Sequence, residues 1–504
     1  MVSMRPTNRR SVTIAVMVAT FLTAMDNTVV STAMPTIVSD LGGIQLISWV
    51  FAVYVLTTAA TTPIFGKLSD LYGRKLIFTI GTILFLLGSA LSGASQTMVE
   101  LILFRAFQGI GAGAVFPITL TIIGDLYQGE ARARIQGLFS AVWGISGVVG
   151  PLVGGFFVDV ISWRWIFYIN IPIGIVSIAL LWFFLHEKFE RKSHRIDILG
   201  ALLFLCGISS LLYAILSGGQ TLAWNSPLLI VLLTSSAVLL ALFLFVESRA
   251  KEPMLPLSLF HLPGIAIANL ASLFGAAMLI AMSVYIPLFV QGIMGQSATS
   301  AGLTLTPMSI GWPLGAAVGG RIMFRIGPRI TSVLGAFLLV LGCAWLSLLP
   351  MGTSQWPFIL IMVIVGFGFG FAFTAFTILV QSAVDWQMRG TSTGTNQFMR
   401  NIGQTLGIAL FGLWLNDTVA KKLMNPALFR VTHGNAGTLG RLLNPAVASH
   451  FNASFVQSMR AVLYDGLHAV FIMVIAVSII VFVLTFFLPT KFPEQMHSPS
   501  KTSA

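Results

Sequence analysis

The sequence predicts an all-α, polytopic membrane protein with fourteen transmembrane helices. Three observations support this prediction. Charged residues make up 9% of the 504 residues, against about 25% in an ordinary soluble domain. Hydrophobic residues make up 56% of the chain. They gather in blocks of about 20 residues, the length of helix that crosses a hydrocarbon core about 30 Å thick.

Fourteen apolar segments are candidate spans. The first follows Arg5, Arg9 and Arg10, and it is too long for the apolar part of a cleavable signal peptide. Cys206 and Cys343 both fall inside apolar segments, so we expect neither a disulfide framework nor a metal site. The spans lie near residues 11–33, 46–66, 76–95, 99–123, 136–158, 165–185, 197–216, 227–246, 263–291, 301–321, 330–349, 357–382, 391–415 and 467–488.

The basic residues are distributed as expected for cytoplasmic loops, where Lys and Arg accumulate. With the N-terminus inside, most of them fall in cytoplasmic segments, whereas the short external loops hold Arg164. Arg105 and Arg400 fall inside spans, and further basic residues lie in the long external segment 417–466. The distribution predicts a multi-pass protein of the cell membrane with both termini cytoplasmic. It also explains the formal net charge of +12 without a nucleic-acid partner.

Two polar stretches, 186–195 and 247–262, divide the chain. We expect an N-terminal six-helix bundle over 1–190, an inserted helix pair over 191–255, and a C-terminal six-helix bundle over 256–504 with the external loop 417–466. An internal repeat supports the division, because GKLSDLYGRK at 66–75 aligns with GRIMFRIGPR at 320–329. Gly73 then corresponds to Gly327 and Lys75 to Arg329, while Phe324 replaces Asp70. Two related halves are common in alternating-access transporters.

Five motifs resemble those of one family. GKLSDLYGRK resembles the loop signature of the major facilitator superfamily, LFRAFQGIGAG (103–113) its fourth-helix motif, and GISGVVGPLVGG (144–155) its fifth-helix antiporter motif. MDNTVVSTAMP (25–35) and WRWIFYINIPIG (163–174) resemble signatures of the 14-span drug:proton antiporter branch. The resemblance covers nearly the whole chain. It implies two six-helix bundles that rock about a central site, and exchange of protons for drugs in a multidrug-efflux protein linked to antibiotic resistance.

Asp26 is the strongest candidate for proton coupling. A carboxylate inside a spanning helix is costly and is usually functional. Burial disfavours the charged form of a carboxyl group and a nearby cation favours it, so such a group can bind a proton in one state and release it in another. At 1.5 Å per residue, Asp26 and Arg105 lie at similar depths, about 21–22 Å from the cytoplasmic side. We therefore expect an Asp26–Arg105 pair, either direct or through water or Gln108.

Two further motifs are candidates for conformational change. In the loop signature, an ion pair of Asp70 would hold the cytoplasmic side closed; anchoring by basic residues alone is the alternative. In the fifth-helix motif, steps of three and four place glycines along one face, so that a partner helix can approach closely in a rocking or a static interface. The proline of this motif can kink the helix. The gating residues are Gly66, Lys67, Asp70, Gly73, Arg74 and Lys75, and the antiporter residues are Gly144, Gly147, Gly150, Pro151, Gly154 and Gly155.

Polar and aromatic side chains within spans are candidates to line a substrate site, although each aromatic side chain could instead pack against its neighbours. Arg400 lies in a half whose spans contain no acid, so we expect it to face water, a cavity or another polar group. With Asp26 as the one well-embedded acid, we expect neutral, zwitterionic or singly positive substrates rather than dications. The candidates are Asn27, Trp49, Tyr54, Gln108, Tyr285, Gln291, Trp312, Phe371, Phe373, Asn396, Gln397 and Arg400.

The sequence lacks several motifs of energy coupling and catalysis. It has no GxxxxGK[ST] loop, no HExxH and no Cys/His cluster. We therefore expect no enzyme activity, no cofactor, no metal and no use of ATP by this chain. The expected partners are a small-molecule substrate, protons and the lipid bilayer, and we expect a functional monomer. The leading interpretation is a proton-coupled antiporter that exports amphipathic drugs. The alternatives are an exporter or flippase of one endogenous metabolite or lipid, and a membrane sensor that does not transport.

Overall fold

The computed structural model describes residues 7–127, 129–187, 197–218, 222–223, 225–250, 253, 255–384, 388–424 and 452–490. In these residues the regular structure is helical, apart from an isolated bridge between Gly218 and Leu222. The prediction of an all-α protein is therefore confirmed for the part of the chain that the structure describes.

In the described residues, the N-terminal half contains seven α-helices and the 3-10 helix η1, and it is followed by the inserted pair. The predicted sixth span consists of two helices, α6 and α7, because the regular helix is interrupted at Ile169. The helices are α1 (Arg9–Leu41), η1 (Ile44–Leu46), α2 (Ile47–Tyr72), α3 (Arg74–Ala94), α4 (Met98–Leu126), α5 (Gly129–Val160), α6 (Trp165–Tyr168) and α7 (Asn170–Phe184), and the pair is α8 (Ile198–Ser217) and α9 (Pro227–Arg249).

The C-terminal half contains six long helices after a short 3-10 helix. They are η2 (Leu257–His261), α10 (Pro263–Gly292), α11 (Ala298–Ile326), α12 (Pro328–Ser347), α13 (Gln355–Ser382), α14 (Arg389–Leu423) and α18 (Ala453–Thr485).

Local sequence signals set several of the helix ends. The side chains of Thr97 and Asn452 accept hydrogen bonds from backbone N–H groups in the first turns of α4 and α18. Ser226 caps α9 in the same way and is followed by Pro227 at the first helical position. Such caps satisfy N–H groups that have no partner within the helix. A backbone N–H group without a hydrogen-bond partner is costly in hydrocarbon. The caps therefore help to keep the connections between helices short.

Twelve helical segments in the described part of the chain are long and apolar enough to cross a membrane. Helices α11 and α14 are not among them, although they contain 29 and 35 residues. Polar residues lower their hydropathy, and in α14 these include Asn396, Gln397 and Arg400. The chain is therefore an all-helical, multi-pass membrane protein, while the count of fourteen spans stays a prediction.

The helices α14 and α18 are longer than their apolar segments. Helix α14 continues to Leu423 and α18 begins at Ala453, so both ends of the expected loop 417–466 are helical. Lys422 Nζ lies 2.8 Å from Asp465 Oδ2 and links the two helices. Hydropathy detects only the apolar part of a helix, whereas backbone hydrogen bonding continues into its polar turns. The rest of the expected loop, residues 425–451, lies outside the described residues.

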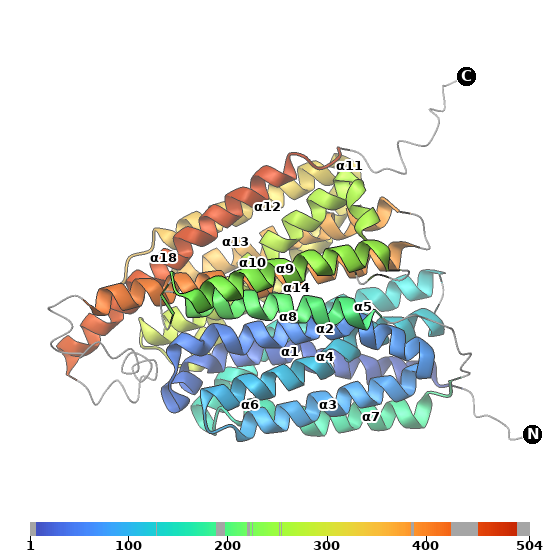
Figure 1. Cartoon of the computed structure of the whole chain (residues 1–504), viewed down its shortest axis with the longest axis horizontal. Coiled ribbons are helices and arrows are strands. Elements are labelled where there is room, and N and C mark those ends of the chain that lie inside the picture. The colour runs from blue at the N-terminus through green and yellow to red at the C-terminus, as the bar shows by residue number, and fades with distance from the viewer. Residues whose placement is uncertain are drawn as a thin grey trace, which may run out of the picture.

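The two halves form two groups of roughly parallel helices (Figure 1). We call the end at which α1 begins and α18 ends the terminal face, and the opposite end the distal face. In Figure 1 the C-terminal helices α12 and α18 incline away from α1 and α3 toward the terminal face. Helices α8 and α9 run across the middle of this view, between the two groups. The arrangement agrees with two bundles and an inserted pair.

Helix α8 contacts both halves. The rings of Tyr213 on α8 and Trp49 on α2 lie 6.1 Å apart. On the same helix, the ring of Phe204 lies 5.0 Å from that of Phe398 on α14. The inserted pair therefore covers the seam between α2 and α14.

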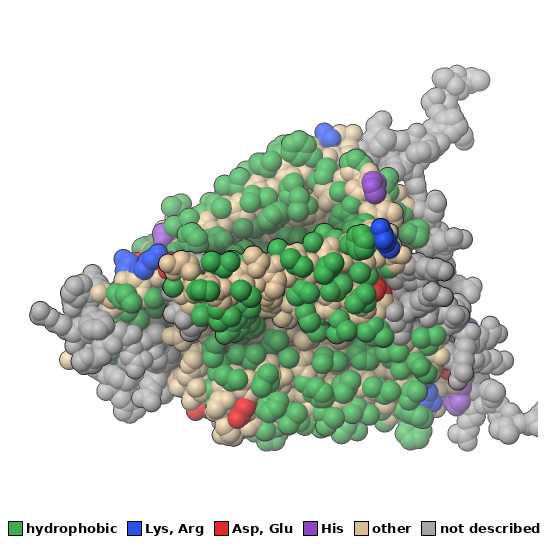
Figure 2. Space-filling model, in the orientation of Figure 1, with side chains coloured by type: hydrophobic (Ala, Val, Ile, Leu, Met, Phe, Trp, Pro, Cys, Tyr) green, Lys and Arg blue, Asp and Glu red, His purple; other side chains and the backbone are tan. Residues whose placement is uncertain are grey.

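Hydrophobic side chains cover the flank of the molecule, and charged side chains lie toward its two ends (Figure 2). Exposed apolar residues occur on the outer helices, for example Leu103 on α4, Phe183 on α7 and Val231 on α9. A surface of this kind suits hydrocarbon rather than water, and it agrees with a membrane-embedded flank.

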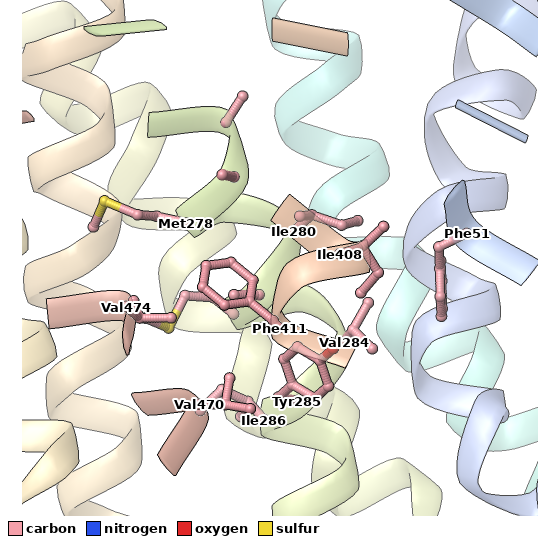
Figure 3. Packing of buried hydrophobic residues seen from close by; sticks show 14 of the residues in the cluster. Phe51, Met278, Ile280, Val284, Tyr285, Ile286, Ile408, Phe411, Val470 and Val474 are labelled. Carbon is pink, nitrogen blue, oxygen red and sulfur yellow. The ribbon is translucent and has the colours of Figure 1, made fainter. Parts of the chain in front are cut away.

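The largest cluster of buried hydrophobic residues extends across both halves. In Figure 3, Tyr285 on α10 lies beside Phe411 on α14, with Phe51 on the neighbouring α2. The Tyr285 and Phe411 rings meet edge to face, with centroids 6.5 Å apart. This ring pair packs within the C-terminal half, while the cluster as a whole extends into the N-terminal half through residues such as Phe51.

The internal repeat of the sequence is also a repeat of the structure. Gly73 ends α2 with φ +93°, and Gly327 ends α11 with φ +88°, values that favour glycine because it has no Cβ. Lys75 Nζ donates to the carbonyl of Leu185, just after α7, at 3.0 Å. Its counterpart Arg329 donates through Nε to the carbonyl of Leu488, just after α18. Each basic residue thus binds the end of the last helix of its own half.

Candidate proton-coupling and substrate sites

Asp26 and Arg105 form a buried ion pair. Arg105 Nη1 donates directly to Asp26 Oδ2, and both side chains are fully buried. Gln108, one turn further along α4, accepts from Arg105 Nη1 at 2.9 Å and donates through Nε2 to Asp26 Oδ1 at 2.9 Å. The structure therefore places together the three residues that the sequence grouped by depth. The pair is direct, and Gln108 braces it rather than bridging it.

Tyr54 covers the other side of the guanidinium. The centre of its ring lies 3.9 Å from Arg105 Cζ, and the Tyr54 side chain is buried. A cation over an aromatic face is attracted by the negative face of the ring. Arg105 Nε and Nη2 have no hydrogen-bond partner in this arrangement. The charge is therefore held by one carboxylate, one amide and one ring.

Asn170 is a further member of this network that the sequence analysis did not single out. Its Nδ2 lies 3.3 Å from Asp26 Oδ1 and 2.9 Å from Ser89 Oγ, and the residue is fully buried at the start of α7. Ser89 Oγ in turn donates to the carbonyl of Phe167 at 2.8 Å. The sequence feature that could have indicated Asn170 is its position as a polar residue within the apolar motif WRWIFYINIPIG. The network links α1, α3, α4 and α7.

The basic residues of the gating motif bind within the N-terminal half. Arg74 Nε lies 2.8 Å from Asp125 Oδ2, and the backbone N–H groups of Arg74 and Lys75 donate to Glu187 at 3.0 and 3.1 Å. Glu187 thus caps the start of α3, where a carboxylate also faces the positive end of the helix dipole. The side chains of Lys67 and Asp70 lie outside the described residues, so the predicted pairing of Asp70 stays a prediction. A Cβ on Gly66 would meet nothing within 4 Å.

The glycines of the antiporter motif contact two helices, which corrects the expectation of a single face. A Cβ on Gly150 or Gly154 would lie 2.0 or 2.3 Å from hydroxyl oxygens of Thr28 or Thr32 on α1. The other members face α11: a Cβ on Gly144, Gly147 or Gly155 would approach Pro313, Ser309 or Thr299 to within 3.0 Å, and the carbonyl of Pro151 would lie 2.3 Å from a Cβ on Gly302. Over a helix of this length, steps of three and four drift around the axis, so one motif serves two neighbours.

Contacts between the two halves gather near the distal face. Gln291 Nε2 on α10 donates to the carbonyl of Thr32 on α1 at 2.9 Å. Asp159, at the end of α5, accepts from the N–H groups of Ala298 and Thr299 at 3.2 and 2.9 Å, and so caps the start of α11 in the other half. Asn416 Nδ2 on α14 donates to the carbonyl of Gln45 at 3.2 Å. These bonds hold the distal ends of the bundles together.

Several substrate candidates occupy packing positions. Tyr285 is fully buried against Phe411, and Gln291 makes the inter-half bond described above. Trp49 packs against Tyr213 of the inserted pair, and Phe371 lies between Gly319 and Gly335. The side chain of Asn27 lies outside the described residues. In this structure the side chains of Tyr285, Gln291, Trp49 and Phe371 contact other residues of the protein and do not line an open site.

Polar candidates of α14 bind the neighbouring helices. Asn396 Nδ2 donates to Asn269 Oδ1 at 2.8 Å and to Ser272 Oγ at 2.9 Å, which fastens α14 to α10. Gln397 donates to Asn401 Oδ1 at 3.1 Å on the same helix. Arg400 Nη2 donates to Thr377 Oγ1 at 2.9 Å on α13. These contacts explain how α14 tolerates a polar sequence between apolar helices.

The fold and the buried ion pair define a two-bundle membrane transporter, and comparison with known proteins gives its family. The chain belongs to the Major Facilitator Superfamily, whose profile matches residues 16–408. The resemblance read from the five motifs is thereby confirmed. Membership of a transporter family indicates a transporter rather than an enzyme.

Among characterised relatives, the chain is 41% identical to "Multidrug resistance protein 3" of Bacillus subtilis over 85% of this chain and 83% of that protein. It is 34% identical to "Multidrug transporter protein MdtP" of the same organism, over 90% and 88% of the two chains. Among solved structures, an inward-facing, unoccupied bacterial homologue of the lysosomal transporter Spinster matches with a TM-score of 0.70 at 16% identity, over 95% of this chain and 97% of that one. That likeness supports the fold alone.

Proposed function

We propose that the protein is a proton-coupled secondary antiporter that exports amphipathic drugs by alternating access. The observation that carries the proposal is the Asp26–Arg105 network, because it places a titratable group in the middle of a bundle that must rearrange during transport. Two relatives that are named as multidrug proteins, and that align with most of the chain, support the substrate class.

In the proposed topology all fourteen predicted spans cross the membrane, and the terminal face is cytoplasmic. Helices α11 and α14 complete the count, since each packs against other spanning helices of its half and α11 also packs on α5. The Lys and Arg residues of the expected cytoplasmic loops support this orientation. With the distal ends held together by Gln291, Asp159 and Asn416, the described state is the one that is closed to the outside.

The network then has a defined place in the cycle. In the state that is closed outside, Arg105 binds Asp26 as an ion pair, so we place release of the proton toward the cytoplasm before this state. Opening toward the outside would expose Asp26 to a more acidic medium. Protonation would remove the charge that Arg105 binds and weaken the pair. Proton entry would thus be coupled to the arrangement of α1, α4 and α7.

An assay of dye efflux tests the proposal. Cells that express the protein are expected to extrude several unrelated amphipathic dyes, and a protonophore is expected to abolish the extrusion. Export of a single compound would favour an exporter or flippase of one metabolite or lipid. Binding of dyes without net movement would favour a sensor. Continued efflux after collapse of the proton gradient would contradict the proposed coupling.

A further inference from the structure

Arg400 is a membrane-embedded cation with no acidic partner in the described part of the chain. Its Nη2 donates to Thr377 Oγ1 at 2.9 Å and to the carbonyl of Phe373 at 3.4 Å, both on α13. Its Nε is buried and has no hydrogen-bond partner. The contacts of Arg400 are therefore neutral, and part of its donor capacity is unused.

The other arginine inside the spans differs in this respect. Arg105 binds the carboxylate of Asp26 and is fully buried, whereas the side chain of Arg400 is only half-buried. An uncompensated charge at membrane depth is costly and is usually found where it has a functional partner. Because a guanidinium binds carboxylates through strong charge-assisted hydrogen bonds, a half-buried arginine whose contacts in the described residues are all neutral suits an anionic partner.

Three stacked aromatic rings extend away from the guanidinium of Arg400. Arg400 Cζ lies 4.2 Å from the centre of the Phe373 ring. Phe373 stacks on Phe369 with an angle of 8° between the rings and 5.5 Å between their centres. Trp312 on α11 stacks on both, at 5.3 Å from Phe373 and 5.6 Å from Phe369. The half-buried Trp312 leaves part of this aromatic group accessible.

Arg400 and the three rings lie in the part of the C-terminal half that is nearer to the terminal face. Counted along their helices at 1.5 Å per residue, Arg400 and Phe373 are about 14–17 Å from that face. The bonds between the halves lie toward the opposite end, at Gln291 and Asn416. Pro313, next to Trp312, packs on Gly144 of α5, so the aromatic group adjoins the seam between the halves.

We propose that Arg400 and the rings of Phe373, Phe369 and Trp312 form a subsite for an aromatic substrate that carries one carboxylate, including a zwitterion. The inference rests on the proposed function and adds to it a substrate class. It widens the expectation drawn from Asp26 of neutral, zwitterionic or singly positive substrates, because Arg400 supplies the charge that a carboxylate requires. The carboxylate binds the guanidinium of Arg400, and the planar part of the substrate lies against the aromatic group at the half-buried Trp312. Asp26 remains available to the proton, because the substrate charge is held in the other half.

The test compares an aminonaphthoic acid with its methyl ester, which differ in one negative charge. Equilibrium binding is measured by fluorescence with protein in nanodiscs and without a pH gradient. Wild type is expected to bind the acid more tightly than the ester. Because a charge-assisted hydrogen bond contributes about 1.5–3 kcal/mol, Arg400→Gln is expected to weaken binding of the acid by about 10-fold or more and to leave the ester within about 2-fold.

Two further variants serve as a control and as a substitute for Arg400→Gln. Arg249→Gln is the matched control, since Arg249 also lies 4.2 Å over a phenylalanine ring, that of Phe245, but on the exposed side of α9. It is expected to change neither affinity. If Arg400→Gln fails to fold, Thr377→Val removes the hydroxyl that positions Nη2 and is expected to weaken binding of the acid alone.

Equal binding of acid and ester by wild type, or equal loss of both in Arg400→Gln, would overturn the subsite. The outcome is separable from the proposed function, because binding needs no gradient. If the wild-type protein fails to export dyes but still binds the acid more tightly than the ester, the proposed antiporter is rejected and the subsite is not.

Discussion

The carboxylate of Asp26 accepts hydrogen bonds from three side chains, and these contacts decide what its replacement would do. Asn in place of Asp26 keeps the size of the side chain and can still bond to Gln108, Asn170 or Arg105. It cannot titrate, and it leaves the charge of Arg105 uncompensated. Removal of one partner from a buried pair typically costs about 3–5 kcal/mol. The ring of Tyr54 offsets part of this cost.

We therefore predict that Asp26→Asn inserts and folds with a lowered thermal midpoint, and that its proton-coupled export falls at least about tenfold. The double variant Asp26→Asn with Arg105→Gln removes both charges. It is expected to recover thermal stability, because no buried charge remains unpaired, without recovering export. Thermal unfolding and efflux of the same preparations provide the two measurements. Wild-type efflux by a well-folded Asp26→Asn protein would contradict the role of Asp26.

The sequence predicted the pairing of Asp26 with Arg105 because depth in a membrane follows directly from the rise of a helix. It did not predict Asn170. The residue reaches Asp26 from the start of α7, and the packing of α7 against α1 that brings them together cannot be read from hydropathy. Tyr285 and Gln291 show the opposite limit. Both are polar or aromatic residues within spans, but their neighbours follow from helix packing: Tyr285 contacts Phe411 of its own half, and Gln291 contacts Thr32 of the other half.

Helix α5 approaches its neighbours closely. Gly155 packs against the backbone of α11 at Thr299, where an added Cβ would lie 2.4 Å from Cα. A methyl group at this point must separate the two halves near the distal face. Overpacking typically costs about 1–3 kcal/mol. The state that is closed at the distal face would lose that free energy, while a state in which the halves are apart there would not.

We predict that Gly155→Ala shifts the protein toward opening at the distal face, by about 5- to 150-fold in the conformational equilibrium. Modification of a cysteine introduced at Thr32, in a background without Cys206 and Cys343, measures the shift as faster labelling. Gly394→Ala is the matched control, because the same substitution on α14 meets nothing within 4 Å. Unchanged labelling in Gly155→Ala, or an equal change in both variants, would show that the seam does not set the equilibrium.

The spacing of the glycines predicted close packing of α5 but not its two neighbours. Gly150 and Gly154 face α1, and Gly155 faces α11. A sequence pattern specifies which side chains are small, whereas the neighbour that fills each gap follows from the packing of the whole bundle. The inserted pair is similar, since Phe204 and Tyr213 read simply as apolar residues in sequence and contact both halves in the structure.

For the whole molecule, the proposed topology gives a prediction about sides of the membrane. Fourteen spans place the C-terminus in the cytoplasm and the connection 217–226 outside. A reporter fused after Lys501 is expected to give a cytoplasmic signal, and one inserted within 217–226 an external signal. If one of the helices α11 and α14 failed to cross, thirteen spans would remain and the C-terminal reporter would appear on the external side. Such a result would reject the fourteen-span topology and the cytoplasmic C-terminus.

The division into halves could be predicted because the loop signature recurs in both. Gly73 and Gly327 require a positive φ, and Lys75 and Arg329 each bind the end of the last helix of their half. The state of the molecule could not be predicted in this way. Closure at the distal face depends on contacts such as Asp159 with the start of α11, between residues far apart in sequence whose distance changes during a transport cycle.

The central claim is that a proton gradient drives substrate movement through Asp26, and purified protein in lipid vesicles tests it most directly. Vesicles with an acidic interior receive an amphipathic dye outside, with no ATP present. We expect wild-type protein to accumulate the dye, a protonophore to discharge it, and Asp26→Asn protein of equal folded content to show no accumulation. Accumulation that ignores the imposed pH gradient, or that persists unchanged in Asp26→Asn, would contradict the account.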